Sequence, residues 1–138
     1  MLNAFFQIMT EVVCEVIQNA QGQFLACLRP EGKHLSGRWE FPGGKVDSGE
    51  SQEGALMREL QEELAISVQV GQALRPVVWS YEKKWIRLSP FHCRIIRGDP
   101  QPLEHEKLIW CAPEDFNTLV WADADQPILR EILDSKSA

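Results

Sequence analysis

A leucine stripe within residues 43–66 constrains the fold more than any other feature of the sequence. Leu56, Leu60 and Leu64 recur every fourth residue, which places them on one face of an α-helix. Ser48 and Ser51 precede the stripe as candidate N-caps. The second half of this segment therefore predicts an amphipathic helix whose apolar stripe can lie on a β-sheet.

The polar side of this predicted helix carries three closely spaced carboxylates. Glu59, Glu62 and Glu63 stand at i, i+3 and i+4, so they repel one another unless protons or a hard divalent cation neutralise them. Mg²⁺ is such a cation, because it takes oxygen ligands from carboxylates, waters and substrate phosphates. The preceding turn at 43–45 supplies flexible backbone and one lysine that a phosphate chain could approach. The alternative is a solvated acidic face on which Arg58 and Glu62 form an ordinary i,i+4 pair.

The stretch from Gly44 to Ile66 resembles the Nudix box, Gly-x5-Glu-x7-Arg-Glu-U-x-Glu-Glu-x-Gly-U, in which U is a bulky aliphatic residue. Eight residues fall on its fixed positions without a gap: Gly44, Glu50, Arg58, Glu59, Leu60, Glu62, Glu63 and Ile66. Ala65 replaces the last glycine, near a helix end where a left-handed conformation is often needed. Alanine adopts that conformation at a cost of about 1 kcal/mol, so we expect a slightly altered helix end and unchanged chemistry.

Length and composition bound the fold and its partners. With 138 residues, 44% of them hydrophobic, the chain 1–138 is expected to form a single domain with a real core. The net charge of −6 argues against a stable nucleic-acid partner, but a bound metal would still admit a nucleotide. The four cysteines have no metal-ligand spacing and are interpreted as buried hydrophobes in a reducing compartment. Since neither a secretory signal nor a membrane span is indicated, we expect a cytoplasmic protein.

The remaining segments predict strands on both sides of the central helix and further helices near the end. Two strands joined by a turn-like cluster suggest a hairpin at Ile8–Ile17 and Phe24–Leu28. An extended segment at Ser67–Tyr81, interrupted by glycine and proline, precedes a strand at Lys84–Ile96. The chain then predicts a short strand, a short helix and a terminal helix, at Leu108–Cys111, from Pro113, and at Gln126–Leu133. This order indicates an α/β layer structure, and the Nudix resemblance implies an α/β/α sandwich with a mixed sheet.

The resemblance also implies a metal centre holding Mg²⁺, with Mn²⁺ as the alternative. Its ligands would be the three helix carboxylates Glu59, Glu62 and Glu63, and the site would also include Gly43. One site carboxylate would help to deprotonate the attacking water. Glu104 stands six residues before Trp110, a spacing similar to that of the catalytic loop glutamate in MutT-type enzymes, with Glu106 as the other candidate.

A second implied feature is structural. Glu50 and Arg58 are expected to form an ion pair that fixes the loop against the helix, although Arg58 could instead touch phosphate. Lys45 is a phosphate-binding candidate, with a solvated surface lysine as the alternative. His105 is expected to be a loop histidine, since hard Mg²⁺ would not choose it.

The flanks of the box resemble those of MutT-type nucleoside triphosphate pyrophosphohydrolases. Residues 38–45 read RWEFPGGK, and the tail from Glu104 is similar to the bacterial CTP pyrophosphohydrolase branch. The resemblance implies that Arg29, Phe41 and Asp125 surround the base. Phe41 could stack on a base or pack in the core. Asp125, where the MutT pattern has asparagine, could accept from cytosine or a guanine edge or cap the terminal helix, and Asp123 could exchange places with it.

These features predict Mg²⁺-dependent hydrolysis of a nucleoside triphosphate to the monophosphate and pyrophosphate. CTP, dCTP and oxidised nucleotides such as 8-oxo-dGTP are the leading substrates, and cleaning of the nucleotide pool is the corresponding role. Other Nudix substrates, namely ADP-ribose, dinucleoside polyphosphates and capped RNA, are alternatives, as is a non-catalytic binding module. No membrane partner is expected, and the chain would be a monomer or a homodimer.

Overall fold

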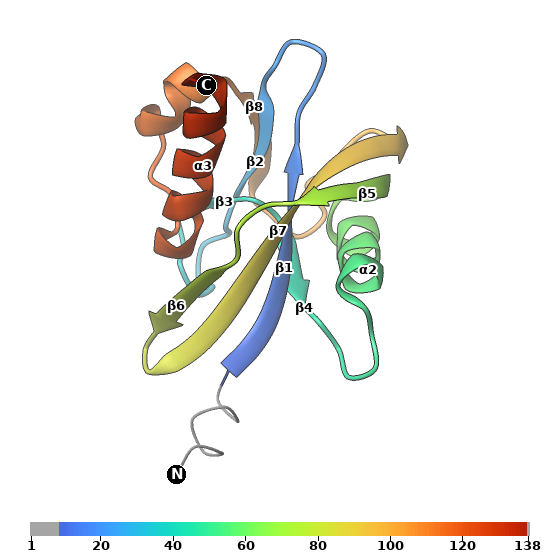
Figure 1. Cartoon of the computed structure of the whole chain (residues 1–138), viewed down its shortest axis with the longest axis vertical. Helices are drawn as coiled ribbons and strands as arrows, with labels where there is room; N and C mark the ends of the chain where they lie inside the picture. The colour runs from blue at the N-terminus through green and yellow to red at the C-terminus, as the bar shows by residue number, and fades with distance from the viewer. Residues whose placement is uncertain (1–8, 138) are drawn as a thin grey trace.

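The computed structural model describes residues 9–137, with side chains described through residue 135. Two helices flank a core of strands, α2 on one side and α3 on the other (Figure 1). Ile8, where the first predicted strand begins, lies outside the described residues. The observed elements, in chain order, are β1 (Met9–Ile17), β2 (Phe24–Leu28), β3 (Trp39–Glu40), β4 (Gly43–Lys45), α2 (Gln52–Leu64), β5 (Ser67–Ala73), β6 (Val77–Tyr81), β7 (Lys84–Arg97), β8 (Lys107–Cys111), η1 (Pro113–Thr118), η2 (Asp123–Asp125) and α3 (Gln126–Ser137).

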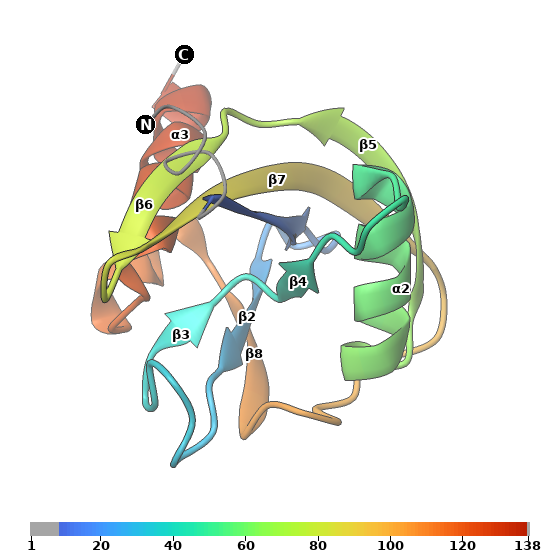
Figure 2. The same ribbon diagram turned by 90° about the horizontal axis from the view of Figure 1, so that it is seen from below.

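The strands form two sheets, which Figure 2 shows from below. The first has the order β4-β1-β7-β5, with β6 also paired to β7. Its β1–β7 pair is parallel and its other pairs are antiparallel, so the sheet is mixed, as predicted. The second sheet has the order β3-β2-β8 and is antiparallel throughout.

The predicted hairpin of β1 and β2 is wrong. After the turn held by Asn19, whose side chain accepts from the backbone of Gln21 and Gln23, the two strands enter different sheets. An isolated bridge between Gln18 and Phe24 joins them. The strands separate because all of β2 and the second half of β1 are buried on both faces, so these parts need a helix on either side rather than the half-exposed environment of a simple hairpin.

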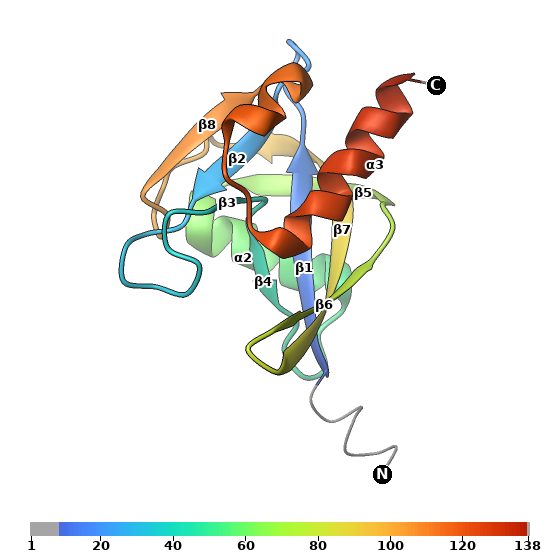
Figure 3. The ribbon, with the colours of Figure 1, turned by 90° about the vertical axis from the view of Figure 1, so that its left-hand side faces the viewer.

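Alternating side chains from β1 and β2 build an apolar cluster on each side. Toward α2, Val13 and Ile17 of β1 pack with the leucine stripe of the helix, and toward α3, Cys14 and Val16 pack with Ile128. Figure 3, in which α3 faces the viewer, shows this second helix lying across the strands. The chain therefore forms the predicted α/β/α sandwich.

The leucine-stripe helix begins and ends as its sequence indicates. Ser51 is the N-cap, and its hydroxyl accepts from the backbone N–H of Gly54 at 3.0 Å. Ala65 ends the helix in the left-handed conformation, with φ 58°, and its N–H donates to the carbonyl of Gln61 at 3.1 Å. Ala65 therefore adopts the left-handed conformation that glycine favours at a helix end.

The predicted flexible turn at residues 43–45 is a strand instead. β4 pairs with β1 at the sheet edge, and a Cβ atom on Gly43 would overlap the backbone carbonyl of Val13. Glycine is needed there because two backbones approach closely, not because the segment bends. Within residues 9–137, no helix is long and apolar enough to cross a membrane.

Candidate active site

A cavity of about 800 Å³ gathers most of the residues that the sequence singled out. It is lined by β1, β3 and β4, by the C-terminal end of α2, and by the loops after β2 and before β8. Seven of the predicted site residues are on its wall: Arg29, Phe41, Gly43, Lys45, Glu63, Glu104 and Asp125. Glu59 and Glu62 extend from the same helix as Glu63.

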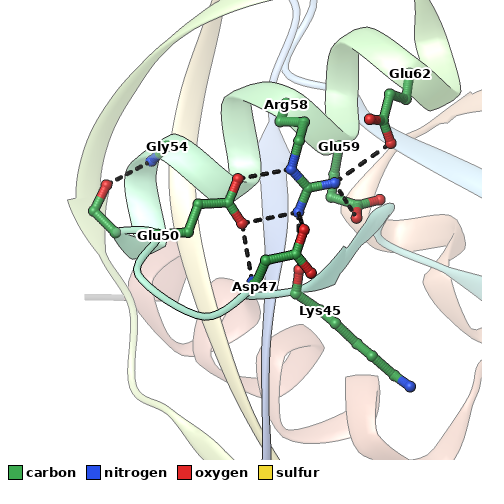
Figure 4. Close-up of polar contacts among 8 residues, drawn as sticks. Lys45, Asp47, Glu50, Gly54, Arg58, Glu59 and Glu62 are labelled. Carbon is green, nitrogen blue, oxygen red and sulfur yellow. Dashed lines mark hydrogen bonds and ion pairs between the residues drawn. The ribbon is translucent and has the colours of Figure 1, made fainter.

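Arg58 is the centre of an ion-pair cluster beside the cavity (Figure 4). Its guanidinium donates to Glu50 at 2.7 and 2.9 Å and to Glu59 at 2.9 Å, and lies 3.4 Å from Glu62. It also donates to the backbone carbonyl of Lys45 at 3.1 Å. The hydrogen bond from Arg58 lowers the pKa of Glu50 to about 2. This cluster ties the loop before α2 to the helix, as the sequence led us to expect of the Glu50–Arg58 pair.

The three helix carboxylates lie in different surroundings. The side chain of Glu62 is 54% exposed, that of Glu59 is 17% exposed, and that of Glu63 is 9% exposed. Burial raises the pKa of Glu63, and a hydrogen bond with Glu59 and the negative charges nearby raise it further. Its Oε2 is buried and has no hydrogen-bond partner in residues 9–137. Burial and the neighbouring negative charges therefore favour the protonated form of Glu63.

Gly44 makes room for one of these carboxylates. A Cβ atom at this position would overlap the carboxylate of Glu59, so any larger residue would push that side chain away. The side chain of Lys45, the next residue, is exposed and extends away from the Arg58 cluster (Figure 4). The backbone here shapes the carboxylate site, and Lys45 is among the residues that line the cavity.

The loop before β8 brings Glu104 to the cavity. Glu104 is exposed, and its charge contributes to the raised pKa of Glu63. The backbone N–H of Leu103 donates to the carbonyl of Glu63 at 3.1 Å, which docks the loop on the end of α2. Glu106, the other candidate, is exposed and is not among the residues that line the cavity.

The residues expected to surround a base also line the cavity, and each has a protein partner. Arg29 forms an ion pair with Glu40 at 3.2 Å, and the ring of Phe41 is buried against Trp121, with the ring centroids 5.1 Å apart. Phe41 thus packs in the core while it borders the cavity. Asp123, the alternative to Asp125, is exposed.

Asp125 does not act as a simple helix cap. It is 5% exposed, and its Oδ2 accepts the backbone N–H of Phe41 at 2.8 Å. Burial raises the pKa of Asp125, and the charge of Glu40 raises it further. The neutral carboxyl that this favours offers a hydroxyl donor as well as an acceptor. The expectation that Asp125 can only accept hydrogen bonds from a base therefore applies to its ionised form and not to its neutral form.

Two wall residues were not singled out from the sequence as site residues. Glu40 belongs to β3 and His105 to the loop before β8, and they meet at 2.8 Å between His105 Nε2 and Glu40 Oε2. The sequence does contain an indication that Glu40 has a partner. A charged residue between two large apolar residues, Trp39 and Phe41, needs one when its neighbours are buried. Nothing local in the sequence indicates that His105 is that partner.

The donor set suits a hard divalent cation. The carboxylates provide oxygen ligands, one of them has a buried oxygen without a hydrogen-bond partner among the described residues, and the lack of a Cβ atom at Gly44 lets the Glu59 carboxylate lie against the backbone there. Within residues 9–137 no three potential ligands are already gathered as a metal cluster. Arg58 contacts one oxygen each of Glu59 and Glu62, which leaves the second oxygen of each carboxylate outside these ion pairs.

Comparison with known proteins agrees with this geometry. The NUDIX domain family matches residues 9–133. The CTP pyrophosphohydrolase of Escherichia coli (strain K12) is 38% identical over 130 residues, covering 94% of this chain and 96% of that protein. The 8-oxo-dGTP diphosphatase of the same strain is 25% identical over 122 residues, covering 88% of this chain and 95% of that protein.

A solved structure extends the likeness to the fold. The solution structure of the E. coli ORF135 protein superposes with a TM-score of 0.81 and 37% identity, covering 93% of this chain and 91% of that one. The fold and its carboxylate-lined cavity define a hydrolase of phosphate-linked substrates. The chain belongs to the Nudix family and is a Nudix hydrolase. Nudix hydrolases generally need divalent metal ions.

Proposed function

We propose that this protein hydrolyses a nucleoside triphosphate to the monophosphate and pyrophosphate with the help of Mg²⁺ or Mn²⁺. One observation carries the proposal. Glu63 and Glu104, both metal-ligand candidates, line the same cavity as Arg29, Phe41 and Asp125, the candidates for contact with the base. A cavity of about 800 Å³ is within the usual range for small-molecule sites, so a whole nucleotide can span the two groups.

The proposed ligands are Glu59, Glu62, Glu63 and Glu104, together with Gly43. A metal ion bound there would neutralise polyphosphate charge and lower the pKa of a bound water. One site carboxylate would accept a proton as water attacks phosphorus and the phosphoanhydride bond breaks. Pyrophosphate and the nucleoside monophosphate would be the products.

Two basic residues have different proposed roles. Arg58 is a structural residue, because its guanidinium is already bound by carboxylates and by a backbone carbonyl. Lys45 borders the cavity and is exposed, so its ammonium group is available to the phosphate chain.

We propose CTP, dCTP or 8-oxo-dGTP as substrates, with cleaning of the nucleotide pool as the role. The names of the E. coli relatives support this range, and so does the cavity wall around Asp125. Cytosine and guanine both present an amino group to an acceptor, and a neutral Asp125 would add a donor.

Further proposals concern the whole chain. We propose that residues 1–138 form a single Nudix domain that acts in the cytoplasm as a monomer or a homodimer. The four buried, unpaired cysteines are in keeping with a reducing compartment.

The direct test measures pyrophosphate release from CTP, dCTP, 8-oxo-dGTP, dGTP, UTP and ADP-ribose with Mg²⁺, and again with EDTA. Turnover of a cytosine or oxidised guanine triphosphate that EDTA abolishes is the expected result. Cleavage of ADP-ribose alone would contradict the substrate proposal, and binding without any turnover would favour a non-catalytic module.

Variants of the same helix make the test specific. Glu63→Gln should reduce kcat by at least about a hundredfold, a loss typical of a removed catalytic group. Glu53→Gln changes an exposed carboxylate in the first turn of α2 and should retain wild-type turnover. Equal activity of both variants would show that the metal-ligand assignment is wrong.

A further inference from the structure

The imidazole of His105 lies between two carboxylates from different parts of the site. Its Nε2 is 2.8 Å from Glu40 Oε2 and 3.8 Å from Glu63 Oε1. Glu40 belongs to β3, and Glu63 belongs to α2. The His105 side chain is only 4% exposed. We call the part of the cavity formed by Arg29, Glu40, Phe41 and Asp125 the nucleoside wall. A single buried ring thus contacts the nucleoside wall through Glu40 and approaches Glu63 on α2.

The loop that carries this ring is attached at both ends. Toward α2, the N–H groups of Gln101 and Leu103 donate to the carbonyls of Leu64 and Glu63 at 2.9 and 3.1 Å. Toward β2, the N–H of Glu106 donates to the carbonyl of Leu28 at 2.9 Å. These bonds place the His105 backbone between the end of the helix and the end of the strand, so the ring has little freedom to move.

The contacts continue to the far side of the cavity. Arg29 Nη1 lies 3.2 and 3.3 Å from the two oxygens of Glu40, and Arg29 Nε donates to the carbonyl of His34 at 2.6 Å. A continuous row of buried and half-buried side chains therefore runs from Arg29 through Glu40 and His105 to Glu63.

The packing of the ring alone does not explain a histidine here. Its Nδ1 is buried and has no hydrogen-bond partner among the described residues, which is unfavourable for stability. An apolar ring would avoid that cost. Compared with an apolar ring, histidine adds Nε2. This nitrogen donates to the Glu40 carboxylate in the tautomer that carries the hydrogen on Nε2.

We propose that His105 is a positioning residue that holds Glu40 and Glu63 at a fixed separation, and so aligns the nucleoside wall with the carboxylates of α2. This inference rests on the proposed function, because it assumes that Glu63 binds the metal ion. Partners that orient a ligand in this way commonly change metal affinity when they are replaced.

The test compares two amides of different length. The amide nitrogen of His105→Gln reaches about as far as Nε2, whereas that of His105→Asn falls short of Glu40. The Mn²⁺ dissociation constant is measured by electron paramagnetic resonance without nucleotide, and KM and kcat are measured with CTP. We expect His105→Asn to raise the Mn²⁺ dissociation constant about tenfold and to raise KM, and His105→Gln to recover most of both. His92→Gln, on β7 outside the cavity wall, serves as the control for loss of an imidazole.

The measurements distinguish a positioning role of His105 from a purely structural one. Wild-type Mn²⁺ affinity and KM in a folded His105→Asn protein would overturn the inference, as would a change confined to the melting temperature. If His105→Asn does not fold, His105→Phe keeps the ring shape without a donor, and the same losses are expected. Failure of the wild-type protein to bind Mn²⁺ or to hydrolyse any nucleotide would instead overturn the proposed function.

Discussion

At the scale of single residues, Glu15 is the least favourable group in the core. It stands on β1 between Val13 and Ile17, fully buried, and neither of its carboxyl oxygens has a hydrogen-bond partner within the part of the chain that the structure describes. Burial raises the pKa of Glu15 well above its usual value. The folded protein therefore holds the proton longer than the unfolded chain does, so the free energy of unfolding should fall as pH rises above about 4.3.

Replacing Glu15 with methionine should stabilise the protein. The thioether side chain has a similar length and needs no hydrogen bond, so we expect a gain of about 1–3 kcal/mol at pH 7 and a smaller gain at pH 5. Urea unfolding at pH 5 and at pH 7 measures the gain in the free energy of unfolding. Glu11→Met, on the same strand but with a side chain that is 40% exposed, should change stability by less than about 0.5 kcal/mol. A loss of stability in Glu15→Met would show that the carboxyl is needed where it lies.

At the scale of elements, the end of α2 offers a direct test of its substituted box position. Ala65 has φ 58°, which is unfavourable for alanine and favourable for glycine. Ala65→Gly should therefore raise the free energy of unfolding by about 0.5–1 kcal/mol. Met57→Gly, at an exposed position within the helix, should lower it by about 1 kcal/mol. Thermal unfolding of the two variants measures these changes in stability. If Ala65→Gly lost as much stability as Met57→Gly, the left-handed conformation of Ala65 would not be strained.

The loop before α2 depends on charge. Because Arg58 lowers the pKa of Glu50 to about 2, the stabilisation from this pair is fully present above the unfolded pKa near 4.3 and is lost as pH falls toward 2. Glu50→Gln should therefore be less stable than the wild type at pH 7, and the two proteins should converge only as pH falls through about 2. Unfolding followed across this range measures the difference. A difference in the free energy of unfolding that stays constant with pH would show that the Glu50–Arg58 ion pair does not cause it.

The same element shows how far sequence reasoning reaches. The cap, the leucine stripe and the end of α2 follow from neighbouring residues, so they could be predicted. β3 and β4 have two and three residues, too few for any period, and β4 was misread as a flexible turn. The contact between Glu40 and His105 joins positions far apart in the chain, so it depends on how the sheets pack. The pair of Arg58 with Glu50 and the alternative pair with Glu62 both follow from sequence spacing and are both present, but the contact of Arg58 with the adjacent Glu59 is not predicted by that spacing.

At the scale of the whole molecule, both sides of the sandwich meet at the cavity. The α2 side contributes Glu63, and the segment that leads into α3 contributes Asp125. The distance between them depends on β1 and β2, which are packed by both helices. A ligand that links the two walls should therefore stabilise the entire fold, since unfolding either side destroys the site.

Metal binding should appear as thermal stabilisation. At a Mn²⁺ concentration one hundred times its dissociation constant, linkage adds about 2.7 kcal/mol, or roughly 5–10 °C in melting temperature for a domain of this size. The gain is expected because a cation relieves the repulsion among Glu59, Glu62 and Glu63. Glu63→Gln should lose most of the shift, and Glu53→Gln should keep it. A shift that survives Glu63→Gln would place the metal elsewhere, whereas a shift that EDTA reverses and that Glu63→Gln removes would support Glu63 as a metal ligand.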